Sequence, residues 1–147
     1  MFKQRKGFTL IELLVVLAII GLLSTLAVVS LNNARQKSRD SKRLSDIKQV
    51  QTALELYFSD VGTYPVEAAA VVLGSANEVT LSSTNGFAAA AAGTTYVGKV
   101  PSNPTPNGAD YSYLSADGST YSIGFSLEGA TGGLAAGVHT ASPSGIQ

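Results

Sequence analysis

Apolar residues are concentrated in one long segment near the start of the chain. After Glu12 no charged residue occurs before Arg35, and most positions in residues 13–31 are apolar. At about 1.5 Å of rise per residue, such a segment in helical form spans roughly 30 Å, the thickness of the hydrocarbon core of a bilayer. The pattern therefore predicts a transmembrane helix over residues 8–31.

Helical spacing of the apolar positions continues beyond this segment. Residues 34–60 contain neither proline nor glycine. Their apolar side chains recur mostly every three or four positions, at Leu44, Ile47, Val50, Leu54, Tyr57 and Phe58. This single stripe predicts an amphipathic stem helix over residues 32–62 that packs on a further part of the chain. We expect the helix to end near Val61, because Gly62 suits the left-handed position after a helix and Pro65 blocks its resumption.

A different pattern begins at Thr63, where short segments alternate with Gly, Asn, Pro and Ser. We expect strands over residues 95–100, 111–115 and 121–127, with a hairpin at Asp117-Gly118 between the last two. The alanine-rich segments 65–76 and 86–93 are expected to hold short helices. Residues 63–147 would then form a loop and a small antiparallel sheet. The predicted fold is α+β, with a long N-terminal α-helix, half of it transmembrane, packed on this head.

The charged residues are unevenly placed, although the chain has ten basic and ten acidic residues. Lys3, Arg5 and Lys6 precede the apolar segment, which predicts a cytoplasmic N-terminus by the positive-inside bias. Further bases gather in the stem, intermixed with acids, whereas the head is acidic. This mixture argues against nucleic acid as a partner. We interpret the stem bases as a surface near the membrane and as partners of acids on neighbouring copies, with Arg39 or Arg43 as candidates.

A short motif lies at the start of the apolar segment. Residues 6–12 read KGFTLIE, and together with the long apolar helix they resemble the leader and N-terminus of type IV pilins and of type II secretion pseudopilins. The resemblance covers residues 3–65. It implies that residues 1–7 are a leader peptide, that a prepilin peptidase cuts between Gly7 and Phe8, and that Phe8 is then N-methylated. An ordinary secretory signal peptide is the alternative, but no small-residue cleavage site follows the apolar segment.

Glu12 is an ionisable residue inside the apolar segment, where an unpaired charge is costly. Its side chain could extend toward the cytoplasmic headgroups. The resemblance implies instead that Glu12 neutralises the Phe8 amine of an adjacent subunit as the helix enters a growing filament. Glu12 and Phe8 are thus the predicted assembly residues.

Two positions bear on how the helix behaves in a filament. Many members of the family carry a proline where this chain has Val29, and the helix kinks or melts there on assembly. Gly21 matches a frequent glycine of the family, and glycine weakens a helix by roughly 0.5–1 kcal/mol relative to alanine. Local melting at Gly21 is one expectation, and close helix packing in the membrane is the other.

The C-terminal part also resembles major pseudopilins, in which this region can hold a calcium ion. Asn103 stands where an aspartate is frequent in those proteins. Asp110, Asp117 and Glu128 could supply oxygen ligands, with scattered surface acids as the alternative. The chain has no cysteine, a single histidine (His139), and no paired carboxylates at a readable spacing. We therefore expect no other cofactor and no enzymatic activity.

These features predict a structural subunit of a type IV pilus or pilus-like helical filament, formed by homo-oligomerisation through residues 8–31. The precursor would cross the lipid bilayer of the cytoplasmic membrane once, and the filament would be extracellular or lie in the periplasm. The resemblance implies a prepilin peptidase, an inner-membrane assembly platform and an ATPase as partners. The alternatives are a major pseudopilin of a type II secretion-like machine and a minor pilin whose head binds DNA or a surface.

Overall fold

The computed structural model describes residues 7–147, and its first element is a single long helix. Helix α1 comprises Leu10–Val61, 52 residues. It ends where the sequence predicts: Gly62 has φ of 86°, and its amide donates to the Phe58 carbonyl at 2.8 Å. A residue without a side chain adopts this left-handed conformation at little cost, so Gly62 terminates the helix. The chain divides after Arg35 into two compact units.

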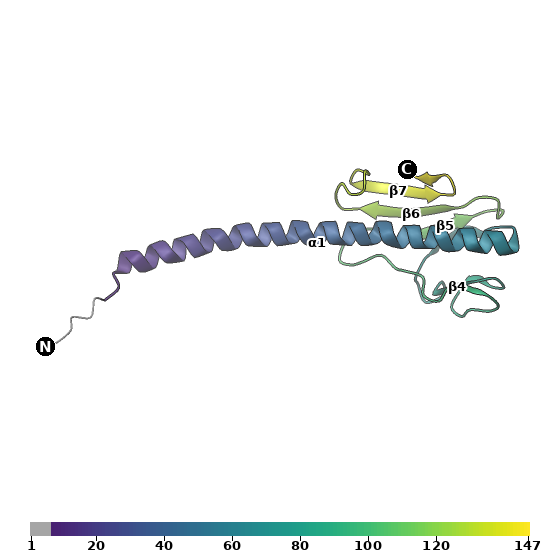
Figure 1. Cartoon of the computed structure of the whole chain (residues 1–147), viewed down its shortest axis with the longest axis horizontal. Coiled ribbons are helices and arrows are strands. Elements are labelled where there is room, and N and C mark those ends of the chain that lie inside the picture. Colours follow the sequence, from purple (N-terminus) through teal and green to yellow (C-terminus); the bar gives the residue numbers. More distant parts are fainter. Residues whose placement is uncertain (1–6) are drawn as a thin grey trace. The chain divides into compact units, whose positions relative to one another are not determined.

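The second unit, residues 36–147, contains two antiparallel sheets. The larger sheet has the order β1-β5-β6-β7-β8, formed by Glu67–Val72, Ser112–Ser115, Ser122–Leu127, Gly137–Ser142 and Gly145–Ile146. The smaller sheet has the order β3-β2-β4, formed by Gly86–Ala88, Thr80–Ser82 and Thr95–Val97. In the view of Figure 1, β5, β6 and β7 lie on one side of this part of α1 and β4 lies on the other.

A helical stripe on α1 forms the centre of the core. Ile47 and Leu54 are completely buried and Val50 is 1% exposed, whereas Phe58 at the end of the stripe is 38% exposed. The stripe packs in one cluster with Tyr111 and the other buried side chains of both sheets. The predicted α+β fold, with a helix packed on antiparallel strands, is confirmed.

The hairpin prediction is also confirmed. β5 and β6 pair in antiparallel register, and Gly118 between them has φ of 76°. The Asp117 carboxylate accepts hydrogen bonds from the Ser119 amide at 2.9 Å and its hydroxyl at 2.7 Å, which fixes the turn. The strand expected over residues 95–100 is shorter than predicted, because β4 is Thr95–Val97.

The two predicted alanine-rich helices are wrong. Segment 65–76 contains β1, which pairs with β5 through Val72 opposite Ser112, and segment 86–93 contains β3, which pairs with β2. Alanine favours helix by intrinsic propensity, but a short segment gains more from strand pairing next to an existing sheet than from an isolated helical turn. β7 and β8 were not expected from the sequence, since their residues carry little apolar alternation.

Candidate processing and assembly site

Helix α1 begins with a reciprocal cap formed by Thr9 and Glu12. The Glu12 carboxylate oxygen Oε2 accepts from the Thr9 amide and from the Thr9 hydroxyl, both at 2.8 Å. In return, the Glu12 amide donates to the Thr9 hydroxyl oxygen at 3.3 Å. This is a capping box, which satisfies amides that the first helical turn leaves without partners. The cap explains why the helix begins at Leu10 and fixes the carboxylate beside the first turn.

The predicted cleavage position lies just before this cap, outside the helix. The Phe8 side chain is 89% exposed. A Cβ atom at Gly7 would meet no atom within 4 Å, so nothing in the fold of the described residues requires glycine there. The fold therefore gives no reason for a glycine at position 7, whereas recognition by another protein would give one. The predicted leader peptide, residues 1–7, lies outside the described residues except for Gly7.

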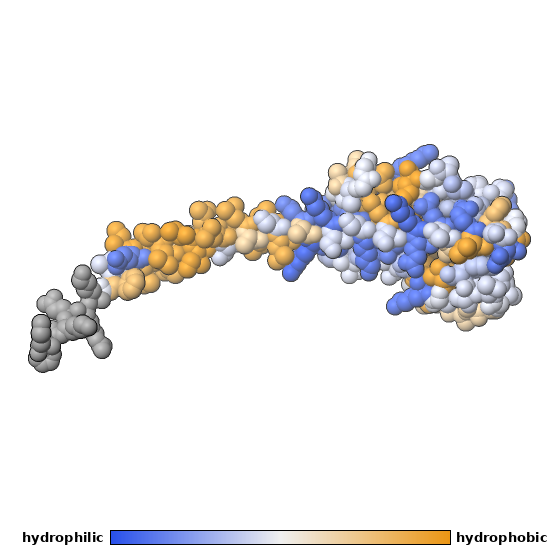
Figure 2. All heavy atoms as spheres, viewed as in Figure 1, coloured by the Kyte–Doolittle hydropathy of each residue, from blue (hydrophilic) through white to orange (hydrophobic). Residues whose placement is uncertain are grey.

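The part of α1 that follows the cap exposes its apolar side chains on every face. Leucine, isoleucine and valine side chains from Leu10 onward are about half exposed or more, and Figure 2 shows them as a continuous orange surface. This helix is long and apolar enough to cross a membrane, with a mean hydropathy of 2.8 in its most apolar window. The Ser24 and Thr25 hydroxyls donate to the carbonyls of Ile20 and Leu22 at 2.7 and 2.8 Å, so both donors are satisfied within the helix.

Gly21 and Val29 both lie inside α1, which is helical throughout in the single chain. A Cβ atom at Gly21 would meet nothing within 4 Å, so no packing within the chain requires a glycine there. Melting on assembly and close packing against other helices therefore both stay predictions for Gly21.

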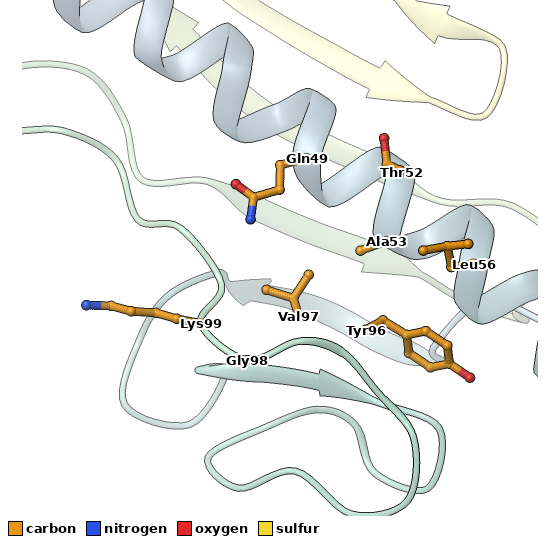
Figure 3. Close-up of a pocket in the computed structure, with 8 residues that line it drawn as sticks. All are labelled: Gln49, Thr52, Ala53, Leu56, Tyr96, Val97, Gly98 and Lys99. Carbon is orange, nitrogen blue, oxygen red and sulfur yellow. The ribbon is translucent and has the colours of Figure 1, made fainter.

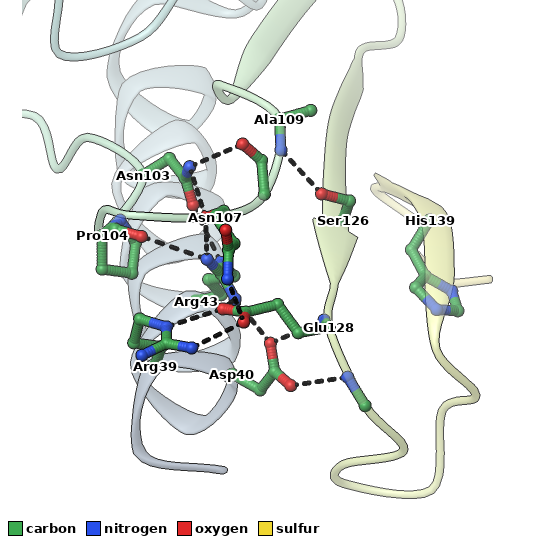
Figure 4. A network of polar contacts seen from close by, with 12 residues as sticks. Arg39, Asp40, Arg43, Asn103, Pro104, Asn107, Ala109, Ser126, Glu128 and His139 are labelled. Atoms are coloured by element: carbon green, nitrogen blue, oxygen red, sulfur yellow. Dashed lines mark hydrogen bonds and ion pairs between the residues drawn. The ribbon is translucent and has the colours of Figure 1, made fainter. Parts of the chain in front are cut away.

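Four charged side chains form a network between α1 and the end of β6 (Figure 4). Arg39 donates through two nitrogens to the two Glu128 carboxylate oxygens, at 2.7 and 2.6 Å. Arg43 donates to Asp40 at 2.6 Å and to Glu128 at 2.7 Å. The Asp40 carboxylate also accepts from the backbone amides of Glu128 and Gly129, at 2.9 and 2.8 Å. Asp40 and Arg43 are completely buried.

The network is electrically balanced, because two arginines face two carboxylates. The Arg39 guanidinium, donating to Glu128, holds the pKa of that carboxyl well below its ordinary value, and hydrogen bonds from Asn107 and Arg43 act in the same direction. Buried charges are tolerated only when they are paired and hydrogen-bonded, as they are here. The network therefore fixes the strand that precedes Glu128 to the stem.

The prediction that Arg43 pairs with acids on a neighbouring copy is wrong, because its side chain has no exposed surface, and for Arg39, which is 21% exposed, such a pair stays a prediction. Both arginines are used within their own chain, by Glu128 and Asp40. A sequence signal could have shown this. Positions 40 and 43 continue the spacing of the buried stripe at 47, 50 and 54, so a helix that buries the stripe also buries these two charges.

The three calcium candidates do not lie together. Glu128 is bonded to the arginines, Asp117 closes the hairpin turn, and Asp110 is exposed. Within residues 7–147 no group of three His, Cys, Asp or Glu side chains is placed to hold a metal. The His139 ring nitrogens lie 3.1 and 2.8 Å from the backbone oxygens of Gln147 and Ala135.

A groove of about 610 Å³ runs between α1 and β4 (Figure 3). Its lining is mixed, with Gln49, Thr52, Ala53 and Leu56 from the helix and residues 96–99 from the strand side. The Tyr96 hydroxyl donates to Asp60 at 2.9 Å, and the ammonium group of Lys99 extends away at the edge. The groove combines no nucleophile with a general base, which gives no support to an active site there.

Comparison with known proteins bears on the N-terminal region first. A family model described as the prokaryotic N-terminal methylation motif matches residues 2–28. The type II secretion system core protein G of Escherichia coli is 44% identical over 63 residues, which is 43% of this chain and 43% of that protein. Several relatives of the same name are likewise covered over less than half of their length. No solved structure matches the chain.

Two relatives match over longer stretches. The fimbrial protein EcpC of Eikenella corrodens is 38% identical over 95 residues, or 64% of this chain and 61% of that protein. The core protein G of Vibrio cholerae is 32% identical over 120 residues, or 78% of this chain and 75% of that protein. The match to the Vibrio protein extends beyond the N-terminal motif into the head, and the chain therefore belongs to the family of type IV pilins and type II secretion pseudopilins.

Proposed function

We propose that this chain is a structural subunit of a pilus-like helical filament, polymerised through its N-terminal helix. The observation that carries the proposal is the combination at the start of α1: an apolar surface exposed on every side, with one carboxylate fixed in its first turn. A single chain leaves this surface uncovered, so it needs lipid or other helices around it. A structural role of this kind needs no catalytic residues.

Processing supplies the partner for Glu12 in this proposal. Cleavage of the Gly7–Phe8 bond by a prepilin peptidase creates a new amine at Phe8, which the same enzyme methylates. Both side-chain bonds of Glu12 use Oε2, and no donor among residues 7–147 is bonded to Oε1. The free oxygen can accept from the Phe8 amine of an adjacent subunit. In an apolar bundle this pair favours the axial offset between neighbouring helices that brings the two charges together, since an unpaired charge there is strongly unfavourable.

In this proposal the subunit is inserted in the membrane before it enters the filament. The bases before the apolar segment place the N-terminus in the cytoplasm and the head on the opposite side. Moving the helix from lipid into a filament exchanges one apolar surrounding for another, so little hydrophobic free energy drives the step. Assembly therefore needs external work, for which a cytoplasmic ATPase and an inner-membrane platform are the proposed partners. The finished filament lies outside the cell or within the envelope.

A pseudopilin of a type II secretion machine is the second form of the proposal. The relative matched over most of its length, from Vibrio cholerae, carries the name of a secretion core protein, whereas the fimbrial relative is covered over 61%. Both forms use the same N-terminal chemistry. Imaging separates them, because a surface pilus gives long filaments at natural expression and a secretion pseudopilus does not.

The test uses three variants expressed with the peptidase and assembly machinery. Gly7→Ala should retain the uncleaved mass, and normal cleavage of this variant would overturn the leader assignment. Glu12→Ala and Glu12→Gln should both be cleaved and methylated at Phe8. Glutamine keeps an acceptor for the Thr9 cap but removes the charge. If the charge pair is required, both variants lack filaments; abundant filaments from Glu12→Gln would show that the pair with the amine is dispensable.

A further inference from the structure

Five oxygen atoms from the stem helix and from separate parts of the head converge on the Arg43 guanidinium (Figure 4). They belong to the side chains of Asp40, Glu128 and Asn103, at 2.6, 2.7 and 2.8 Å, and to the carbonyls of Pro104, at 3.0 Å, and Asn107. We call this set of oxygens the Arg43 cage. Its members come from α1, from the loop between β4 and β5, and from the end of β6.

The residues of the loop between β4 and β5 pack closely around the Arg43 side chain. Gly108 has φ of 94°, and a Cβ atom built there would lie 2.7 Å from an Arg43 nitrogen. Asn103 also donates from its amide nitrogen to the carbonyls of Asn107 and Gly108, at 3.1 and 3.0 Å. The side chain of Arg43 has no exposed surface. Guanidinium and loop are therefore closely packed, with no room for a further group between them.

The oxygen atoms of the Arg43 cage are the kind of ligands that a hard cation prefers. Ca²⁺ takes six to eight oxygen ligands, from carboxylates, amide side chains and backbone carbonyls. The cage offers two carboxylates, one amide oxygen and two carbonyls, but every one of them is bonded to the guanidinium. A calcium ion of the kind that the resemblance implies for this region does not fit while Arg43 is in place.

The charges support the same conclusion. Arg39 and Arg43 balance Asp40 and Glu128, so a neutral side chain at position 103 leaves the network without an excess charge. An aspartate at position 103 would add a third carboxylate to a buried, balanced cluster, at a substantial desolvation cost. Asn103 keeps the acceptor oxygen that the Arg43 Nε atom needs and omits the charge.

We infer that Arg43 is a built-in replacement for a divalent cation: its guanidinium joins the loop, β6 and the stem, so that the head folds without calcium. A corollary follows from the same geometry. Truncation of the Arg43 side chain leaves the oxygens of the cage, including two carboxylates, around an empty position. The truncated protein should bind calcium there, and the wild type should not. The inference concerns folding of the head and is independent of the proposed filament.

The experiment measures the thermal unfolding midpoint of the full chain in detergent, in EDTA and in millimolar calcium. The wild-type midpoint should be the same in both. Arg43→Ala should lower the midpoint in EDTA by about 10 °C or more, because it leaves buried carboxylates unpaired. Calcium should restore part of this loss, and magnesium less, since the smaller ion demands a more regular octahedral site. The exposed Arg35 provides a matched control, and Arg35→Ala should show neither effect.

Two further variants keep the inference falsifiable if Arg43→Ala folds poorly. Arg43→Lys retains a cation in the cage and should remain insensitive to calcium. The double variant Arg43→Ala, Asn103→Asp supplies a third carboxylate and should respond at a lower calcium concentration than Arg43→Ala. A wild-type midpoint that falls in EDTA would overturn the inference. Equal midpoints with and without calcium in both truncated variants would overturn the corollary.

Discussion

Replacing Leu54 by alanine tests whether the sheets cover the predicted face of the stem. Leu54 lies on α1, has no exposed surface and belongs to the core cluster that both sheets share. Leu56, two residues further along the same helix, is 53% exposed and lines the groove beside β4 (Figure 3). The same substitution at the two positions changes helix propensity equally, so their difference reports burial alone.

The magnitude follows from that difference in burial. Removing a fully buried leucine side chain costs the transfer free energy of the lost atoms and leaves a cavity, about 3–5 kcal/mol together. The exposed Leu56 already contacts solvent over half its surface, so Leu56→Ala should change stability by about 0.5 kcal/mol or less. We therefore expect Leu54→Ala to be less stable than Leu56→Ala by about 3 kcal/mol, or about 10 °C in unfolding midpoint.

Urea unfolding of the full chain in detergent, followed by the near-ultraviolet circular dichroism of the tyrosines, measures this difference. Tyr111 and Tyr113 are completely buried in the same core, so their signal reports loss of tertiary packing. The slope of free energy against urea should be unchanged between the two variants, which shows that both unfold the same surface. A Leu54→Ala variant within about 1 kcal/mol of Leu56→Ala would refute the packing described for the stem.

Two other predictions concern the head. The folded state holds the pKa of Glu128 below its ordinary value of 4.5, so as pH falls this carboxylate is protonated in the unfolded chain before it is protonated in the folded chain. The stabilisation that the Glu128 carboxylate contributes is therefore complete above about pH 4.5 and is lost progressively below it. Unfolding midpoints measured from neutral to acidic pH should show this loss in the wild type, and a Glu128→Gln variant with the same acid sensitivity would contradict it. Gly118→Ala should destabilise by about 1–2 kcal/mol through its positive φ, and further because the added Cβ would lie 3.1 Å from the Tyr64 carbonyl oxygen. Gly133 has a similar φ of 85° but open space around its Cβ position, so Gly133→Ala should show the backbone effect alone. An equal melting temperature for the two variants would rule out a contribution from the contact with Tyr64.

Features of this fold that depend on nearby residues were predictable from the sequence, and features that depend on distant residues were not. The end of α1 at Val61 was predictable because a glycine after a helix and a nearby proline act on their own backbone. The hairpin at Asp117-Gly118 was predictable for the same reason. The Thr9–Glu12 cap could also have been read from the sequence, since a threonine followed three residues later by a glutamate is its usual signature.

The alanine-rich segments show where that reasoning fails. The alanines in residues 65–76 favour a helix by intrinsic propensity, and β1 forms because β5 offers it an edge to pair with. β7 was missed for the same reason, since it is held by its pairing with β6, from Leu127 opposite Gly137 to Ile123 opposite Ala141. Strand formation in such segments depends on the neighbouring strand more than on intrinsic preference.

The sequence by itself determined the long apolar helix, its capping signature at Thr9 and Glu12, and the stripe that faces the core. Each of these depends on residues within a few positions of one another, where helical period and capping chemistry act directly. Only the tertiary structure decided what Arg43 binds. Its partner Glu128 is 85 residues away, and the loop oxygens that surround the guanidinium are about 60 residues away. A buried charge takes whichever partners the fold brings to it, and that set cannot be read from spacing along the chain.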